Sequence, residues 1–206
     1  MRFDVEQAQR EALHYREQAR AQAAVIAELE AAKADLQRLH EELVQLSRTD
    51  PLTGIANRRY MGERLADLAQ ATARYGTPLA LAVFDVDRFK EINDRYGHEA
   101  GDRVLVALAG LVTAQARSTD VAARLGGDEF VIVMPGVSGA EAAAACHRLR
   151  ETVHGFDWCG VTPGLAVTIT VGVADGTGEA DPDEILRRAD AALYRGKRAG
   201  RDTVTT

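Results

Sequence analysis

Two pairs of acidic residues follow apolar segments that have the length of β-strands. Asp85 and Asp87 come directly after the apolar run 79–84, and Asp128 and Glu129 follow two glycines between two short apolar runs. Mg²⁺ prefers carboxylate oxygens in proteins, and phosphates and water complete its octahedral shell. Carboxylates from two neighbouring strand ends can hold two ions and leave room for a triphosphate. The pattern therefore indicates two-metal nucleotidyl transfer.

Gly126 and Gly127 precede the second acidic pair and predict a tight hairpin turn. Glycine adopts positive φ and has no Cβ, so a ligand can approach its backbone closely. A purely structural turn would explain the glycines equally well. It would leave two adjacent exposed acids without a role, and this favours a binding site at the hairpin.

The surrounding pattern predicts the elements that carry these acids. Asp50 to Tyr60 indicates a turn that leads into a helix, with Asn57 as its N-cap and an end near Tyr75. Strands are expected at residues 79–85, 121–124, 130–134, 166–173 and 203–205, and further helices at 102–116, 139–153 and 183–198. Helical crossovers around a hairpin indicate an α+β domain. Over residues 49–206 we expect a central mixed, largely antiparallel five-stranded sheet flanked by helices.

Residues 1–48 predict a long helical stalk. The segment contains no Gly or Pro and is rich in good helix formers. Its apolar heptad positions are Val25, Leu29, Ala32, Leu36, Leu39, Leu43 and Leu46, whereas Gln18 and Gln22 weaken the pattern before them. We expect a parallel coiled coil that forms a homodimer. The alternative is one amphipathic helix folded back on its own domain, although such helices usually have a wider apolar face.

Composition and charge restrict the class of protein. Of the 206 residues, 46% are hydrophobic and 27% are charged, as in a soluble folded chain, and the net charge of −6 argues against broad nucleic-acid binding. No apolar run approaches the ~20 residues of a membrane-spanning helix. Met1 to Arg10 does not resemble a signal peptide, and Cys146 and Cys159 lack metal-site spacing. We expect a cytoplasmic protein with reduced thiols and with a sensory domain upstream of the stalk.

Residues 126–130 spell Gly-Gly-Asp-Glu-Phe, and the chain resembles the GGDEF family of diguanylate cyclases that this signature names. The similarity covers about Asp50 to Thr206, and Ile55 stands where the family often has Leu. The other matching motifs are residues 50–59 (DPLTGIANRR), 84–94 (FDVDRFKEIND), 96–98 (YGH), 101–102 (GD) and Lys197 with residues 200–201 (GR).

The resemblance implies a fold of the nucleotidyl cyclase and polymerase palm type. It also implies a reaction in which two GTP molecules condense to cyclic di-GMP and two pyrophosphates. In this family each subunit holds one GTP and two Mg²⁺ or Mn²⁺ ions, so two domains must face each other. The stalk would keep the two domains at high effective concentration.

Site residues follow by similarity. The metal ligands would be Asp85, the Val86 carbonyl, Asp128 and Glu129, with the last two as the catalytic acids and Asp128 in the position of the general base. Asn93 and Asp102 match positions that recognise guanine, and an amide and a carboxylate suit its edge. Further substrate contacts would be Phe89, Lys90, His98, Lys197 and Arg201. Without the motif, the basic residues would be interpreted as solvated surface and His98 as a capping or packing histidine.

A second site is implied upstream of the hairpin. Arg117 and Asp120 resemble the family's product-inhibition motif, and Arg148 resembles a secondary residue of that site. Arg can bind a guanine edge and a phosphate together. An Arg and an Asp at this spacing often form a simple surface pair, and only their offset from the hairpin favours the inhibitory site. Two rival functions remain: a non-catalytic cyclic di-GMP receptor, and a coiled-coil scaffold that senses GTP.

Overall fold

The computed structural model describes residues 22, 25–26, 28–39, 43 and 48–206, and the chain divides into two units, Met1–Ser47 and Arg48–Thr206. In the first unit, residues 28–39 are helical. Described apolar heptad side chains are at least half exposed: Val25 54%, Leu29 65%, Leu36 69%, Leu39 50% and Leu43 68%. Leu46 and the heptad before residue 22 lie outside the described residues. Pairing of two stalks therefore stays a prediction.

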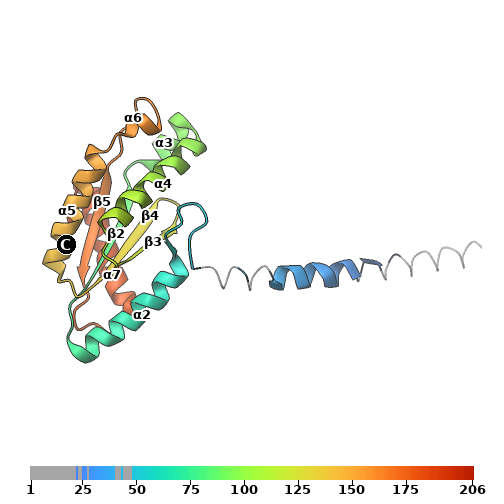
Figure 1. Cartoon of the computed structure of the whole chain (residues 1–206), viewed down its shortest axis with the longest axis horizontal. Helices are drawn as coiled ribbons and strands as arrows, with labels where there is room; N and C mark the ends of the chain where they lie inside the picture. The colour runs from blue at the N-terminus through green and yellow to red at the C-terminus, as the bar shows by residue number, and fades with distance from the viewer. Residues whose placement is uncertain (1–21, 23–24, 27, 40–42, 44–47) are drawn as a thin grey trace, which may run out of the picture. The chain divides into compact units, whose positions relative to one another are not determined.

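Within residues 48–206 a six-stranded mixed sheet has the strand order β1-β3-β4-β2-β5-β6. Figure 1 shows its four longer strands, β3, β4, β2 and β5, side by side. The strands are β1 (Ala56–Asn57), β2 (Leu79–Val86), β3 (Val121–Gly126), β4 (Glu129–Pro135), β5 (Ile169–Asp175) and β6 (Val204–Thr205). The pairs β3–β4, β2–β4 and β2–β5 are antiparallel, and both edge strands pair in parallel.

The α+β class and the largely antiparallel sheet are confirmed, but the expected count of five strands is wrong. The additional strand is β1, in a segment predicted to be a turn. It is two residues long and pairs with β3, more than sixty residues later, through Ala56 with Ala123 and Asn57 with Arg124. Such a non-local pairing leaves no period in the local sequence.

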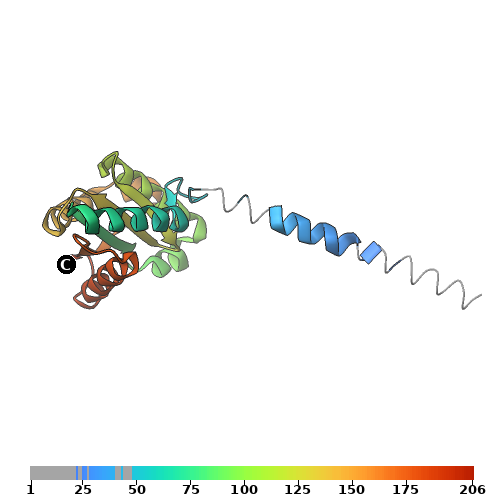
Figure 2. The same ribbon diagram turned by 90° about the horizontal axis from the view of Figure 1, so that it is seen from below.

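Helices cover both faces of the sheet. They are α2 (Arg58–Tyr75), α3 (Phe89–Tyr96), α4 (His98–Gln115), α5 (Gly139–Gly155), α6 (Trp158–Val161) and α7 (Pro182–Arg198). One apolar cluster joins α4 and α5 to the sheet, and the second joins α2 and α7 to its other face. Figure 2 shows α2 and α7 on one side of the domain. None of the helices in the described part of the chain has the length and apolarity needed to cross a membrane.

Strand β2 lies at the centre of the sheet, and all eight of its residues are buried. A strand covered on both faces is apolar throughout rather than alternating. Leu81 and Val83 belong to the cluster under α2 and α7, whereas Ala82 and Phe84 belong to the opposite cluster. Because side chains alternate along a strand, Asp85 points to the α7 face.

Several helix ends follow the sequence prediction. Asn57 caps α2 and accepts a hydrogen bond from the Tyr60 N–H at 2.9 Å, and Gly76 ends this helix with φ of 67°. The prediction missed α3 and α6, placed the start of α4 at residue 102 rather than His98, and began the strand β5 at residue 166 rather than Ile169. Helix α3 has eight residues and packs on α4, so tertiary contacts stabilise it more than its own sequence does.

Candidate active site

The strand register brings the two predicted acidic sites together. Asp85 of β2 is the direct partner of Glu129 of β4. Directly opposed residues of an antiparallel pair project to the same face, so both carboxylates lie on the α7 side. The next pair, Phe84 and Phe130, is buried on the other face and stacks with ring centroids 5.6 Å apart. The stacked rings fix the strand ends that carry the acids.

The hairpin turn between β3 and β4 is held by an arginine that the sequence prediction missed. Gly126 and Gly127 have φ of 144° and 55°, and the strand register shifts between Arg124 and Gly126. Arg124 donates from Nε and Nη2 to the Gly127 carbonyl at 2.9 and 2.7 Å, and from Nη1 to both carboxylate oxygens of Asp50 at 3.1 and 3.3 Å. The turn that presents Asp128 is therefore fixed to the first turn of the domain.

No local signal distinguishes Arg124 from other surface arginines. Its place on β3, three residues before a turn that needs support, is the only sequence feature that could have identified it. Burial raises the pKa of Asp50, but hydrogen bonds from Thr53 and Arg124 outweigh this effect and hold the pKa below its usual range. The Asp50–Arg124 pair is well shielded, with side chains 17% and 13% exposed.

Asp85 is a buried carboxylate with one unsatisfied oxygen. Its Oδ2 forms an ion pair with Nζ of Lys197, whereas Oδ1 is buried and has no hydrogen-bond partner in the described structure. Burial raises the pKa of Asp85 to about 6; Lys197 opposes this shift, and the nearby Asp128 and Asp87 add to it. A buried polar atom without a partner is costly, and a cation would satisfy it.

The residues at this position suit a hard divalent cation. Asp85, the Val86 carbonyl, Asp128 and Glu129 offer only oxygen atoms, which Mg²⁺ prefers. Within the described part of the chain, no three His, Cys, Asp or Glu side chains are gathered closely enough to hold a metal by themselves. Additional oxygens, such as those of a bound triphosphate, would have to complete the shell.

Asp87 differs from Asp85, although the sequence placed them together as one acidic pair. Its Oδ1 accepts from the Thr170 hydroxyl at 2.6 Å, and its Oδ2 accepts from the Thr168 hydroxyl at 2.7 Å and the Asp202 N–H at 3.0 Å. Both oxygens are thus occupied by structural hydrogen bonds. The interpretation of Asp87 as half of a metal-binding pair is not supported.

The predicted base-recognition residues lie on the hairpin of α3 and α4. Gly97, with φ of 85°, connects the two helices, and Asn93 on α3 packs against Gly101 on α4. A Cβ at Gly101 would overlap Asn93 Oδ1 and come within 3.1 Å of the Phe89 ring. Asn93 Oδ1 is buried without a hydrogen-bond partner within the described residues. Asp102, which follows Gly101 on α4, is exposed, and so are His98 and Lys90.

Lys197 and Arg201 reach the strand ends from the C-terminal side. The close approach of α7 to β5 requires Gly172, because a Cβ there would overlap Ala189 O and Leu193 N. This packing carries Lys197 to Asp85. Arg201 has φ of 69° and lines a cavity of about 440 Å³ together with Asp87.

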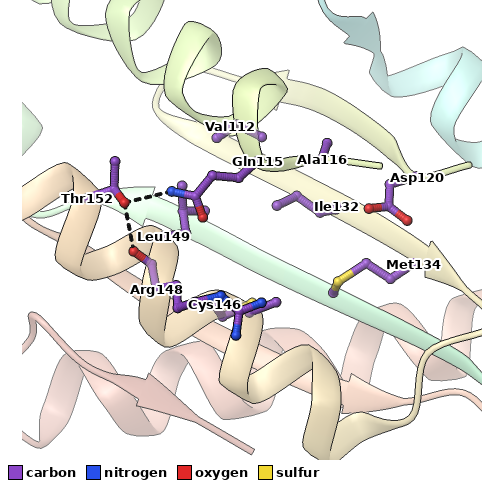
Figure 3. Close-up of a pocket in the computed structure, with 11 residues that line it drawn as sticks. Val112, Gln115, Ala116, Asp120, Ile132, Met134, Cys146, Arg148, Leu149 and Thr152 are labelled. Carbon is purple, nitrogen blue, oxygen red and sulfur yellow. Dashed lines mark hydrogen bonds between the residues drawn. The ribbon is translucent and has the colours of Figure 1, made fainter. Parts of the chain in front are cut away.

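The three predicted inhibition residues lie near one another, away from Asp85. Arg117 donates its backbone N–H to Asp120 Oδ2 at 2.8 Å. Asp120 and Arg148 line one cavity of about 420 Å³ between α4 and α5, which Ile132 and Met134 of β4 also line (Figure 3). Asp120 Oδ1 is buried and unpaired among the described residues. This arrangement leaves an acceptor and a guanidinium at one opening.

Comparison with known proteins agrees with this geometry. Residues 47–203 match the family described as "Diguanylate cyclase, GGDEF domain". The chain belongs to the GGDEF family. The pentapeptide 126–130 is then the last residue of β3, the two-residue turn and the first two residues of β4 in this GGDEF domain, and Asp85 pairs with its Glu129 in the sheet.

Two curated proteins are similar to the GGDEF domain over most of this chain. Diguanylate cyclase DgcP of Pseudomonas aeruginosa is 38% identical over 199 residues, covering 92% of this chain and 30% of DgcP. Response regulator PleD of Caulobacter vibrioides is 40% identical over 165 residues, covering 78% of this chain and 36% of PleD. The chain thus spans about a third of these relatives.

A solved structure extends the similarity toward the stalk. The coiled coil and GGDEF domain of DgcB from Caulobacter crescentus, in complex with c-di-GMP, is 33% identical with a TM-score of 0.71. The match covers 88% of this chain and 98% of the DgcB chain.

Proposed function

We propose that this GGDEF domain is a diguanylate cyclase that condenses two GTP molecules into cyclic di-GMP and two pyrophosphates. The observation that carries the proposal is the register of Asp85 with Glu129, which leaves a buried, unsatisfied carboxylate oxygen beside the catalytic turn. The name of DgcP, a diguanylate cyclase whose match covers 92% of this chain, supports the same activity.

In the proposed reaction the 3′-oxygen of each GTP forms a bond to the α-phosphorus of the other. The bond between the α-phosphorus and the bridging oxygen breaks, and pyrophosphate leaves with the electron pair. A divalent cation held by Asp85, the Val86 carbonyl, Asp128 and Glu129 would neutralise phosphate charge and polarise the reacting groups. Asp128, half-buried and close enough to Asp85 to affect its pKa, would accept the proton of the attacking hydroxyl. We propose two Mg²⁺ or Mn²⁺ ions in each site.

The remaining residues would hold GTP. Asn93 and Asp102 would bind the guanine edge from the α3–α4 hairpin, with His98 and Phe89 beside them. Lys90, Lys197 and Arg201 would neutralise the triphosphate, since charge-assisted hydrogen bonds to phosphate are strong. Each subunit then binds one GTP and needs a second loaded subunit facing it.

The stalk would supply the second subunit. Burying the exposed side chains of its heptad, among them Leu36 and Leu43, against a second copy would remove them from water. A coiled coil also raises the effective concentration of the two domains. We propose that the stalk register, and through it an upstream sensor, controls how often the two sites meet.

Feedback inhibition is a second part of the proposal. The unpaired Asp120 Oδ1 and the Arg148 guanidinium at one cavity, beside Arg117, could bind a guanine edge and a phosphate of the product. Arg117→Ala should weaken inhibition by added cyclic di-GMP at least several-fold. Unaltered inhibition would contradict this assignment.

One experiment separates the proposal from its rivals. The purified chain is incubated with GTP and Mg²⁺, and the products are resolved by chromatography. Formation of cyclic di-GMP supports the cyclase. Tight binding of added cyclic di-GMP without turnover supports the receptor. If the chain neither forms nor binds cyclic di-GMP, the scaffold is supported.

A further inference from the structure

Arg201 and Asp202 adopt an unusual backbone conformation. Their φ angles are 69° and 44°, and Gly200 before them has φ of 123°. Residues with a Cβ are rarely left-handed, and two in succession need surrounding contacts that hold them there. The Arg201 N–H donates to the Gly196 carbonyl at 3.1 Å, which connects the turn to the end of α7.

Asp87 holds this turn from the side of the metal-binding strand. Its buried carboxylate accepts the Asp202 N–H at 3.0 Å while the hydroxyls of Thr168 and Thr170 occupy its remaining positions. Asp87 lies two residues after Asp85 on the same chain segment. The segment that presents Asp85 and the turn that presents Arg201 are therefore joined by one hydrogen bond.

Arg150 of α5 holds the same turn through the side chain of Asp202. Its Nη1 donates to Asp202 Oδ1 at 2.9 Å and lies 3.4 Å from the Asp202 carbonyl oxygen. The side chains of Arg150 and Asp202 are 24% and 34% exposed, so water only partly screens the pair. His154, one turn further along α5, places Nδ1 3.9 Å from Asp202 Oδ2. Helix α5 thus fixes the side chain of Asp202, while Asp87 fixes its backbone.

We propose that Arg150 and Asp202 are positioning residues that hold Arg201 in place for the outer phosphates of GTP. The inference rests on the proposed function, in which Arg201 binds the triphosphate. Arg150 touches no substrate in this account. It acts through Asp202, whose two fixed ends determine the left-handed turn and hence the direction of the Arg201 side chain.

The test compares two nucleotides that differ in their phosphates. Guanosine 5′-(α,β-methylene)triphosphate cannot be cleaved at the reacting bond, and GMP occupies the base pocket without the outer phosphates. In the full chain, Arg150→Ala should weaken binding of the triphosphate analogue about tenfold and leave GMP binding unchanged. The KM for GTP should rise by a similar factor, with kcat changed much less.

Two further variants separate positioning from folding. Asp202→Asn keeps the backbone N–H for Asp87 and an oxygen for Arg150, and Asn tolerates the left-handed region, so affinity should stay near wild type. Asp202→Ala should behave like Arg150→Ala. Arg64→Ala is the matched control, because Arg64 forms a surface pair with Asp67 on α2, across the sheet from α5.

The outcomes distinguish the positioning role of Arg150 from the proposed binding of the triphosphate by Arg201. If Arg201→Ala weakens analogue binding but Arg150→Ala does not, the positioning role is wrong and the site assignment stands. Equal loss of analogue and GMP binding in Arg150→Ala would also overturn it, since that pattern indicates general damage to the fold. Unchanged analogue binding in Arg201→Ala would overturn the role given to Arg201 in the proposed function.

Discussion

Asp85 and Glu129 are direct partners across the antiparallel β2–β4 pair, and Asp85 keeps one buried oxygen without a hydrogen bond. The two carboxylates come from segments more than forty residues apart. The sheet register, rather than either segment alone, brings together the residues of the proposed cation site.

Removing the charge of Asp85 should abolish metal-dependent activity. Asp85→Asn keeps the size of the side chain but offers a weaker ligand and leaves Lys197 without its ion-pair partner. We expect turnover to fall at least about a hundredfold, in line with the loss of one strong electrostatic contact in a closed site. Thermal unfolding with and without Mg²⁺ and the GTP analogue checks the cause, because the ligand-induced stabilisation should disappear with the activity. If Mg²⁺ and the GTP analogue still stabilise Asp85→Asn, the cation binds at a site that does not include Asp85.

Cation binding should depend on pH near the pKa of Asp85. Burial raises this pKa to about 6, so below pH 6 a proton competes with the cation for the carboxylate. In the metal-free domain, Asp85 affects stability in the opposite direction to a carboxyl group whose pKa is lowered by folding. Its native state binds the proton more tightly than the unfolded state, so the contribution of Asp85 to the free energy of unfolding rises as pH falls from 6 toward 3.8. Mg²⁺ titrations at pH values on either side of 6 measure the first effect. An Mg²⁺ affinity that does not change with pH would contradict it.

Gly101 should be essential for base recognition. In Gly101→Ala the new Cβ would displace Asn93, and GTP affinity should fall more than about tenfold. Gly110→Ala is a matched control on the same helix, because a Cβ there meets nothing within 4 Å. The control should be more stable by about 1 kcal/mol and should bind GTP normally. Equal GTP affinities in the two variants would contradict the assignment of Asn93 to base recognition.

The Arg124 bridge should support both stability and the catalytic turn. Arg124→Ala removes hydrogen bonds to Asp50 and to the Gly127 carbonyl, and should lower the free energy of unfolding by about 2 kcal/mol. The Thr53 hydrogen bonds and, after them, the Arg124 contacts hold the pKa of Asp50 down, so the Asp50–Arg124 contribution to stability is present above the unfolded pKa and is lost as pH falls through the native value. Urea unfolding at neutral and acidic pH measures the difference, which should shrink in acid. A difference that does not change with pH would mean that the Asp50 ion pair contributes nothing to it.

Much of the frame could be predicted from local patterns. The run 79–84 is apolar throughout and has the length of a buried strand, and the two glycines before Asp128 predict the hairpin. Asn57 and Gly76 mark the ends of α2 because capping chemistry is local. These features need no knowledge of distant residues.

The remaining features depend on contacts between distant segments. Residue type does not distinguish Asp87 from Asp85, and only the hydroxyls of Thr168 and Thr170 show that Asp87 is structural. Strand β1 exists only beside β3, and α3 only against α4. The roles of Arg124 and Arg150 follow from partners 74 and 52 residues away, respectively.

The most direct test of the account is the stoichiometry of the reaction with GTP and Mg²⁺, followed in parallel for the wild-type chain and Asp85→Asn. Cyclic di-GMP and pyrophosphate are quantified over time. The account predicts two pyrophosphates for each cyclic di-GMP in the wild type and neither product in the variant. GTP binding without cyclic di-GMP in the wild type, or equal turnover in the variant, would contradict it.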